Sequence, residues 1–218
     1  MWWTQPKKPL PAKMPGTPII QDATAAILCG GKSRRMGFDK AFLRTTDGSL
    51  LLAQNAHLLQ KLFARVVLVS DVKEKLLGTE EFSNFPVLED LIPAAGPLGG
   101  IYSILKAENT DCAFVMACDM PGPDSALILQ MHHALGAHQV VLCTHGGRAE
   151  PLFAFYHKSC LPTFHRQLKE QDFRLRSEFS QFSVKTIELS AQQATSCFRN
   201  LNSREDVDRW HKTAGKTL

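Results

Sequence analysis

The sequence has none of the features that mark a membrane-spanning or repetitive protein. No uninterrupted apolar run in its 218 residues approaches the roughly 18 residues that a spanning helix needs, and residues 113–118 are typical of the longest runs. There is no internal repeat, and the first 21 residues contain five prolines and three lysines but no acidic residue. The prolines exclude a helix there, and the polar residues exclude the apolar centre of a secretory signal. We expect a globular protein without membrane contact, preceded by a flexible Pro/Lys-rich extension over residues 1–22.

Cysteine and histidine are present without the spacing of a disulfide framework or a metal site. The six cysteines form no C-x-x-C pair, and most lie within or beside apolar runs, where a reduced thiol is a small buried hydrophobe. Among the histidines, His132 and His133 are adjacent, so a helix would point them in different directions, unlike the i, i+4 pair of a zinc site. The sequence predicts reduced cysteines, a cytoplasmic location and no structural metal.

The excess of positive charge is concentrated in two short segments. The chain carries 25 basic and 21 acidic residues, which give a net charge of +4 and a pI near 8.8. Three lysines lie in the first 21 residues, and residues 28–40 hold four bases against one acid. The rest of the chain is slightly acidic. The charge therefore gives no support for a nucleic-acid partner, and we predict none.

Short apolar runs alternate with longer amphipathic stretches from residue 24 onward. Runs rich in Val, Ile, Leu and Phe predict strands at 24–28, 65–70, 86–88, 112–117, 140–143, 152–156 and 184–189. Apolar residues at helical spacing predict helices at 50–63, 124–135, 159–169 and 203–210, with Asp124 and Ser203 as N-caps. This alternation is typical of βαβ units. We predict a single doubly wound, Rossmann-like α/β domain over residues 23–212, with a mostly parallel sheet, helices on both faces and a C-terminal tail at 213–218.

A glycine-rich basic segment follows the first predicted strand. Residues 28–40 read L-C-G-G-K-S-R-R-M-G-F-D-K, in which the glycines let the backbone approach an anion and the bases attract it. In a doubly wound sheet the ligand lies beyond the carboxyl ends of the strands, which is where this segment falls. A Walker A loop is excluded because Ala26 stands five positions before Gly31, and the glycine spacing differs from G-x-G-x-x-G. We predict a polyphosphate-binding loop, with an ordinary strand-to-helix turn as the alternative.

Two further loops follow predicted strands and carry acidic residues. Asp119 emerges from the apolar run 112–117 before a proline turn, which suits Mg²⁺, a cation that takes carboxylate and phosphate oxygens. Asp90 ends another strand and precedes a Gly/Pro-rich segment with Gly96 and Gly100, whose backbone is free to wrap a flat or anionic group. Together with the phosphate loop, these segments predict one nucleotide site at one edge of the sheet.

These motifs, in this order, resemble the nucleotidyltransferases that act on the molybdenum cofactor. The pattern L-C-G-G-x-S-x-R-M-G-x-D-K at 28–40 is similar to the general nucleotidyltransferase signature. V-L-E-D at 87–90, G-P-L-G-G at 96–100, C-D-M-P at 118–121, E-P-L-F-A-x-Y at 150–156 and N-L-N-S-x-E-D at 200–206 resemble molybdenum cofactor guanylyltransferases. The similarity runs from about residue 24 to 210, with two departures. Cys29 replaces the usual alanine, and Ser70 stands where some members place a nucleotide-contacting asparagine.

The resemblance implies roles for particular residues. Arg35, Lys40 and Asp119 would be catalytic, and Asp119 would bind both GTP and Mg²⁺. A larger set would contact the nucleotide, partly through backbone groups: Leu28, Cys29, Gly30, Lys40, Asp90, Gly96, Gly100, Asp119, Asn200 and Asn202. Mg²⁺ is the one cofactor that the resemblance implies.

The reaction implied by the resemblance joins GMP from GTP to the terminal phosphate of molybdenum-molybdopterin and releases pyrophosphate. That phosphate is already ionised at neutral pH, because its second pKa is about 6, so no general base is required. The alternatives are a CTP-dependent molybdopterin or sugar-phosphate nucleotidyltransferase and a non-catalytic GTP-binding module. The resemblance also allows contacts with cofactor-delivery proteins or molybdoenzymes, and we expect a monomer or a weak oligomer.

Overall fold

The fold alternates strands and helices, and the computed structural model describes residues 20–30, 39–92, 94–198, 201 and 206–210. The strands in these residues are β1 (Ala23–Leu28), β2 (Val66–Ser70), β3 (Val87–Glu89), β4 (Cys112–Ala117), β5 (Val140–His145), β6 (Arg148–His157) and β7 (Val184–Glu188). The α-helices are α1 (Leu51–Gln60), α2 (Lys73–Leu77), α3 (Pro97–Ala107), α4 (Ser125–His133), α5 (Leu161–Lys169) and α6 (Ala191–Cys197). Residues 206–210 are also helical, and short 3-10 turns include η1 (Lys40–Phe42) and η2 (Glu80–Phe82).

All the named strands lie in one sheet, in the order β3-β2-β1-β4-β6-β5-β7. Only β6 is antiparallel to its neighbours, β4 and β5, whereas the other pairs are parallel. The register pairs Leu28 at the end of β1 with Val69 on β2 and with Ala117 on β4. The carboxyl ends of these three strands therefore meet at one edge of the sheet.

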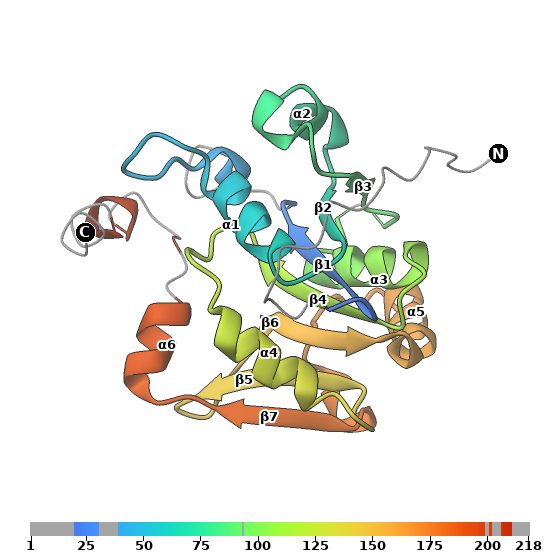
Figure 1. The fold of residues 1–218 in the computed structure, drawn as a ribbon. Coiled ribbons are helices and arrows are strands. Elements are labelled where there is room, and N and C mark those ends of the chain that lie inside the picture. Colours follow the sequence, from blue (N-terminus) through green and yellow to red (C-terminus); the bar gives the residue numbers. More distant parts are fainter. Residues whose placement is uncertain (1–19, 31–38, 93, 199–200, 202–205, 211–218) are drawn as a thin grey trace.

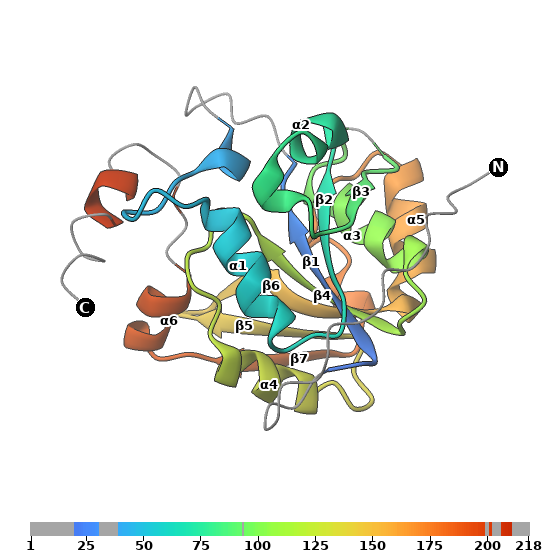
Figure 2. The same ribbon diagram turned by 45° about the horizontal axis from the view of Figure 1, so that its top comes forward.

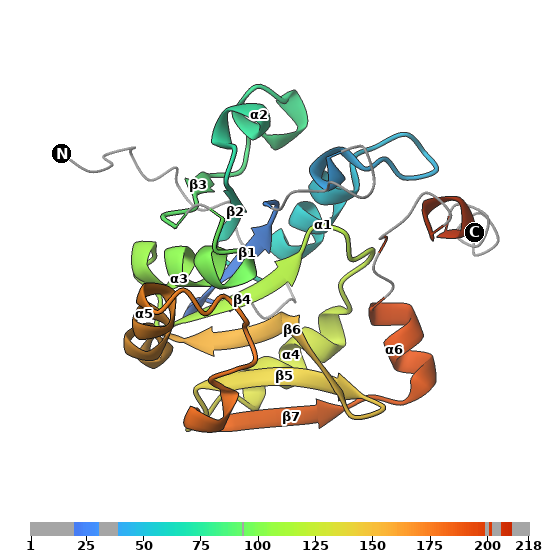
Figure 3. The same ribbon diagram turned by 180° about the vertical axis from the view of Figure 1, so that it is seen from behind.

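Helices cover both faces of the sheet, because the side chains of its inner strands are apolar on both sides. In β1, Ala25 and Ile27 belong to the core cluster that packs against α1, α4 and α6, whereas Ala26 and Leu28 belong to the cluster under α3 and α5. Figure 1 looks onto the face that carries α1 and α4, and Figure 3 shows α3 and α5 on the opposite face. Figure 2 shows α1 lying across the middle of the sheet. The predicted doubly wound α/β fold, with a mostly parallel sheet and helices on both faces, is confirmed.

The Gly/Pro-rich segment at 96–100 is a helix start and was wrongly predicted as a loop. Gly96 is the N-cap of α3, with φ 62° and ψ −150°, a conformation open essentially to glycine alone. Pro97 follows at the first helical position, where its missing N–H costs nothing. Gly100 lies inside the helix, and a Cβ there would come within 3.0 Å of Leu28 Cδ2. The glycine therefore allows α3 to pack closely on β1.

Two residues that the sequence analysis assigned to the extension contact the rest of the protein. Ile20, which we assigned to the flexible extension, is buried, and its N–H donates to Leu62 O at 2.6 Å. Asp22 lies 2.9 Å from Nε2 of His132. Ile20 and Asp22 therefore pack with the domain that we predicted to start at residue 23. The predicted cap Ser203 lies outside the described residues, as do the tail at 213–218 and most of the extension.

The described residues bear on two further expectations. None of the described helices is long and apolar enough to cross a membrane. All six cysteines are free thiols, and five of them are buried. Burial raises the pKa of the thiol of Cys143 to about 12, so this group stays protonated at neutral pH.

An ion pair with a buried carboxylate lies at the edge of the sheet opposite the carboxyl ends of the parallel strands. Glu108, which follows α3, is 9% exposed and accepts from Arg65 Nη2 at 2.9 Å and from Thr24 Oγ1 at 3.3 Å. Arg65 directly precedes β2, and Thr24 lies in β1. One carboxylate thus ties the end of α3 to the starts of two central strands.

Replacing Glu108 by alanine should lower the free energy of unfolding by about 2–4 kcal/mol, because Arg65 and Thr24 lose a buried partner. Urea unfolding followed by circular dichroism measures this change. The control is Arg174→Ala, which removes the ion pair of a side chain that is 82% exposed and should leave stability almost unchanged. Equal effects of the two substitutions would contradict the structural role of Glu108.

Candidate active site

The candidate site lies where β1, β2 and β4 end together. The N–H of Cys118, just after β4, donates to Leu28 O at 3.2 Å, and the N–H of Cys29 donates to Val69 O at 2.7 Å. These two bonds extend the sheet by one residue past its last paired positions. The loops that follow the three strands therefore start from a common rigid platform.

Lys40 and Asp119 form an ion pair above this platform. Lys40 Nζ lies 2.6 Å from Asp119 Oδ2, although the two residues are 79 positions apart in the chain. The Asp119 side chain is 9% exposed and the Lys40 side chain 25%, so solvent screens the pair only in part. The structure thus brings together the two residues that the sequence placed in separate loops. A half-shielded cation beside a carboxylate can bind a phosphate group and a divalent cation.

The segment that carries Lys40 is held by its own local contacts. Lys40 begins η1, and the side chain of Asp39 caps this turn by accepting from the N–H of Ala41 at 3.1 Å. The other carboxylate oxygen of Asp39 lies 3.3 Å from Nζ of Lys75 on α2. Because Asp39 is tied at both oxygens, the backbone at Lys40 has a defined position.

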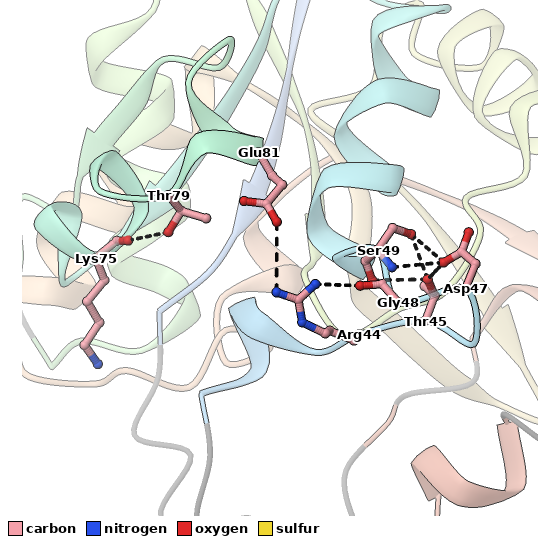
Figure 4. A network of polar contacts seen from close by, with 8 residues as sticks. All are labelled: Arg44, Thr45, Asp47, Gly48, Ser49, Lys75, Thr79 and Glu81. Atoms are coloured by element: carbon pink, nitrogen blue, oxygen red, sulfur yellow. Dashed lines mark hydrogen bonds and ion pairs between the residues drawn. The ribbon is translucent and has the colours of Figure 1, made fainter.

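A network of polar contacts next to η1 ties residues 44–49 to η2 and is drawn in Figure 4. Arg44 donates from Nη1 to Gly48 O at 2.5 Å, and its Nη2 lies 4.0 Å from Glu81 Oε1. Asp47 accepts from the N–H of Ser49 at 3.0 Å and from its hydroxyl at 2.7 Å. The hydroxyl of Thr45 also donates to Asp47, and this hydrogen bond, together with those from Ser49, lowers the pKa of Asp47 to about 2, so its carboxylate stays charged at neutral pH. The network fixes the chain between η1 and α1.

Asn55 holds the loop that contains Asp119, and the sequence analysis missed it. Asn55 lies on α1 and is fully buried, and its Nδ2 donates to Met120 O at 2.7 Å while its Oδ1 accepts from Gly122 N at 3.3 Å. From the other side, the N–H of Leu201 donates to Asp119 O at 3.2 Å. An asparagine on the apolar face of a predicted amphipathic helix is the signal that could have identified it, because a buried amide needs partners.

Asp90 lies at the same edge, turned toward the start of α3. Its Oδ1 accepts from Ser103 Oγ at 2.9 Å and from the N–H of Ile92 at 3.0 Å. Burial raises the pKa of Asp90 above its usual value, and these hydrogen bonds oppose that effect only in part. A Cβ on Gly99 would come within 2.9 Å of Asp90 Oδ2, so glycine is needed for this close approach. Asp90 thereby fixes the loop that leads into α3.

The two departures from the family pattern have clear local roles. The thiol of Cys29 donates to Ile27 O at 3.3 Å, and burial raises its pKa well above the usual value. Burial likewise raises the pKa of Cys118 to about 12, so neither thiol is a nucleophile at neutral pH. Ser70 accepts from the N–H of Val72 at 3.1 Å and so caps the turn after β2.

Three predicted site residues, Arg35, Asn200 and Asn202, lie outside the described residues.

The described residues offer too few ligands for a permanently bound metal ion, but they fit Mg²⁺ that binds together with a nucleotide. No group of three His, Cys, Asp or Glu within the described part of the chain could hold a metal. Asp119 does supply one buried carboxylate at the platform, and Mg²⁺ commonly binds through one or two carboxylates together with substrate phosphates and water. The donor set is therefore compatible with a metal–triphosphate complex.

Comparisons of the sequence with known proteins show a family match. Residues 25–184 match the model of the MobA-like NTP transferase domain. A molybdenum cofactor guanylyltransferase from Syntrophotalea carbinolica is 35% identical over 201 residues, which cover 87% of this chain and 90% of that protein. A second, from Serratia proteamaculans, is 30% identical over 90% of this chain and 98% of its own length.

Solved structures share the fold at lower identity. Molybdopterin-guanine dinucleotide biosynthesis protein A from Archaeoglobus fulgidus has a TM-score of 0.75 at 20% identity, covering 89% of this chain and 100% of that chain. A CMP:2-keto-3-deoxy-manno-octonic acid synthetase in complex with CTP has a TM-score of 0.69 at 13% identity, covering 90% of this chain and 100% of that chain. The fold alone therefore does not distinguish one nucleotide base from another.

Replacing Asn55 by aspartate should lower the free energy of unfolding by about 1–3 kcal/mol, because a carboxylate cannot donate to Met120 O. Urea unfolding measures the change. The matched control is Gln60→Glu, which makes the same chemical change at the end of the same helix, where the side chain is half-exposed. An effect of Asn55→Asp no larger than that of the control would show that Asn55 does not hold the Asp119 loop.

Proposed function

Because the chain belongs to the MobA-like NTP transferase family, we propose that it transfers GMP from GTP to the terminal phosphate of molybdenum-molybdopterin. The products are the guanine dinucleotide form of the cofactor and pyrophosphate. The observation that carries this proposal is the Lys40–Asp119 pair at the joint end of β1 and β4. It brings a cation and a carboxylate together at the carboxyl-end edge of the sheet, where ligands bind in doubly wound folds, and this supports the proposal.

The chemistry requires alignment and charge neutralisation rather than a base. An oxygen of the terminal pterin phosphate forms a bond to the α-phosphorus of GTP, and the bond from that phosphorus to the bridging oxygen of the β-phosphate breaks. Pyrophosphate leaves with the electron pair. The attacking phosphate is already ionised at neutral pH, because its second pKa is about 6, so no proton has to be removed. The protein must hold the two anions in line.

We assign the groups that this step requires to residues at the joint end of β1 and β4. Lys40 carries the cation that would contact the nucleotide phosphates, and the carboxylate of Asp119 would hold Mg²⁺. Mg²⁺ would neutralise the negative charge that develops on the leaving pyrophosphate. The backbone at Leu28, Cys29 and Gly30 lines the same edge, and their position after β1 supports contacts with the nucleotide.

The remaining site residues complete the proposal. We assign Arg35 to the phosphates, because it belongs to the basic segment 28–40. We assign Asp90, Gly96 and Gly100 to the nucleotide side, where Gly96 and Gly100 act by placing the start of α3 against β1. Asn200 and Asn202 flank Leu201, whose N–H donates to Asp119 O, and this contact supports their place beside the site.

The proposal also covers the compartment, the substrates and the protein contacts. Six free thiols support a reducing compartment such as the cytoplasm. GTP and molybdenum-molybdopterin are the proposed substrates, and cofactor-delivery proteins or molybdoenzymes are the proposed protein contacts of a monomer or weak oligomer.

Two other functions are alternatives that experiments can test. A CTP-dependent molybdopterin or sugar-phosphate transferase would share the fold, as the TM-score of 0.69 to a synthetase in complex with CTP illustrates. A GTP-binding module without catalysis would share the nucleotide site. The names of relatives at 30% and 35% identity favour guanylyl transfer.

The protein should discriminate among nucleotides in the presence of Mg²⁺. GTP at about 100 times its dissociation constant should stabilise the folded state by about 2.7 kcal/mol, and CTP and ATP should stabilise it much less. Thermal shift with each nucleotide, followed by pyrophosphate release on adding molybdenum-molybdopterin, measures this discrimination. Release with CTP alone would contradict the guanylyl assignment, and GTP binding without release would identify a binding module.

Asp119→Ala should lower turnover by about 10²-fold or more, by analogy with removal of a preorganised electrostatic group. Lys40→Ala should weaken GTP binding or lower turnover, because the phosphates lose a cation. The matched lysine control is Lys106→Ala on α3, whose ammonium lies 5.5 Å from the Tyr102 ring centre, and its kinetics should be unchanged. Near-normal turnover of Asp119→Ala at saturating Mg²⁺ would remove Asp119 from its role.

A further inference from the structure

The hairpin of β5 and β6 carries a half-buried carboxylate that the proposed mechanism does not use. Glu150 lies on β6 opposite Cys143, next to a register shift at which β6 carries the extra residues 151–153. Its side chain is 20% exposed, and its Oε1 lies 3.7 Å from Nε2 of His145. Burial raises the pKa of Glu150, while the nearby His145 and Arg176 act in the opposite direction. Retaining a carboxylate in this position costs solvation energy that a bound partner would offset.

An aromatic surface lies beside this carboxylate. The imidazole of His145 stacks on Phe198, with ring centres 6.1 Å apart and planes 29° apart. Phe198 in turn meets the edge of Phe153, on β6, with ring centres 5.3 Å apart. Phe198 directly follows α6, and Figures 1 and 3 both show α6 standing beside the end of β7. A flat ring placed here would meet both a π surface and a carboxylate.

Glu150 and Asp119 lie at the same edge of the sheet. β4 and β6 are antiparallel and pair Met116 with Phe153, so Asp119 and Glu150 each lie three residues beyond that pair, toward the same edge. Phe198 and Leu201 are three residues apart, which limits their Cα separation to about 11 Å. One end of this short span packs on His145, and the other donates to Asp119 O. The hairpin is therefore within reach of a substrate whose phosphate lies at Asp119.

We propose that Glu150, with the stacked rings of His145 and Phe198, binds the pterin ring of the acceptor; this rests on the proposed function. The 2-amino-4-oxo edge of a pterin presents an N–H and an amino group side by side, and a carboxylate accepts both at once. The ring face stacks on the aromatic surface. Glu150 is thus a specificity-determining residue for the acceptor.

Guanine presents the same pair of donors, so a carboxylate could accept from either heterocycle. The side of β4 on which each group of residues lies distinguishes the guanine site from the pterin site. The nucleotide groups proposed above, including Asp90 and Gly96, lie on the β1, β2 and β3 side of β4. Glu150 lies on the other side of β4, on the strand next to it. The base of GTP and the pterin therefore occupy opposite halves of the edge, with Asp119 between them.

The test compares steady-state kinetics of the wild-type chain with Glu150→Gln, an isosteric change that leaves one acceptor oxygen. The KM for molybdopterin should rise about tenfold or more, whereas the KM for GTP and the GTP-induced thermal shift should stay within about twofold. The control is Glu188→Gln, which neutralises another carboxylate bound to the same hairpin, where Oε1 accepts from Gly146 N at 3.1 Å. Its molybdopterin KM should stay within about twofold.

A second measurement reads the contact itself. 6-Hydroxymethylpterin should inhibit the wild type about tenfold more strongly than 6-hydroxymethyl-lumazine, which has an oxygen in place of the 2-amino group, and Glu150→Gln should lose this preference. An unchanged molybdopterin KM, an equal rise with Glu188→Gln, or a rise in the GTP KM instead would overturn the role of Glu150. Failure of the proposed function is a different result, since the wild type would then release no pyrophosphate from GTP and molybdopterin.

Discussion

Pairing of β1 with β4 in parallel register sets where the charged groups of the site lie. Because Leu28 is level with Ala117, the chain segments that leave these strands carry Lys40 and Asp119 to one point, where they form a 2.6 Å ion pair. The buried amide of Asn55 then holds the backbone after Asp119. A strand slipped by one residue would turn Leu28 out of its core cluster, so apolar packing and site geometry enforce the same register.

Antiparallel β6 divides the edge of the sheet into two parts. On one side of β4, the start of α3 packs closely against β1 through Gly100 and Leu28, and the residues that we assign to the nucleotide lie on that side. On the other side, the first residues of β6 include Glu150, and the hairpin of β5 and β6 places His145 beside it. A nucleotidyltransferase joins two substrates, and in our proposal each substrate binds one part of this edge, with the Lys40–Asp119 pair between them.

Much of the fold could be predicted from local pattern, whereas contacts between distant segments could not. Runs such as 112–117 are buried on both faces, so their apolar continuity identifies a parallel sheet. The start of α3 was misread because glycine and proline favour loops locally, and only the approach of Leu28 shows why Gly100 lies in a helix. Asn55 acts through Met120, 65 residues away, so no local spacing indicates its partner. Residue types alone predicted the basic loop and the segments with Asp90 and Asp119, the roles of single residues came from the resemblance, and the contact of Lys40 with Asp119 required the structure.

The central claim is that this edge of the sheet directs a pterin phosphate onto the α-phosphorus of GTP. The most direct measurement is a single turnover of the full chain with Mg²⁺, molybdenum-molybdopterin and GTP labelled at the α-phosphorus, followed by separation of the products. The account predicts that the label appears in the pterin–guanine dinucleotide and that the unlabelled β- and γ-phosphates leave together as pyrophosphate. Label recovered as GMP or GDP, or left in GTP while the protein holds the nucleotide, would contradict it.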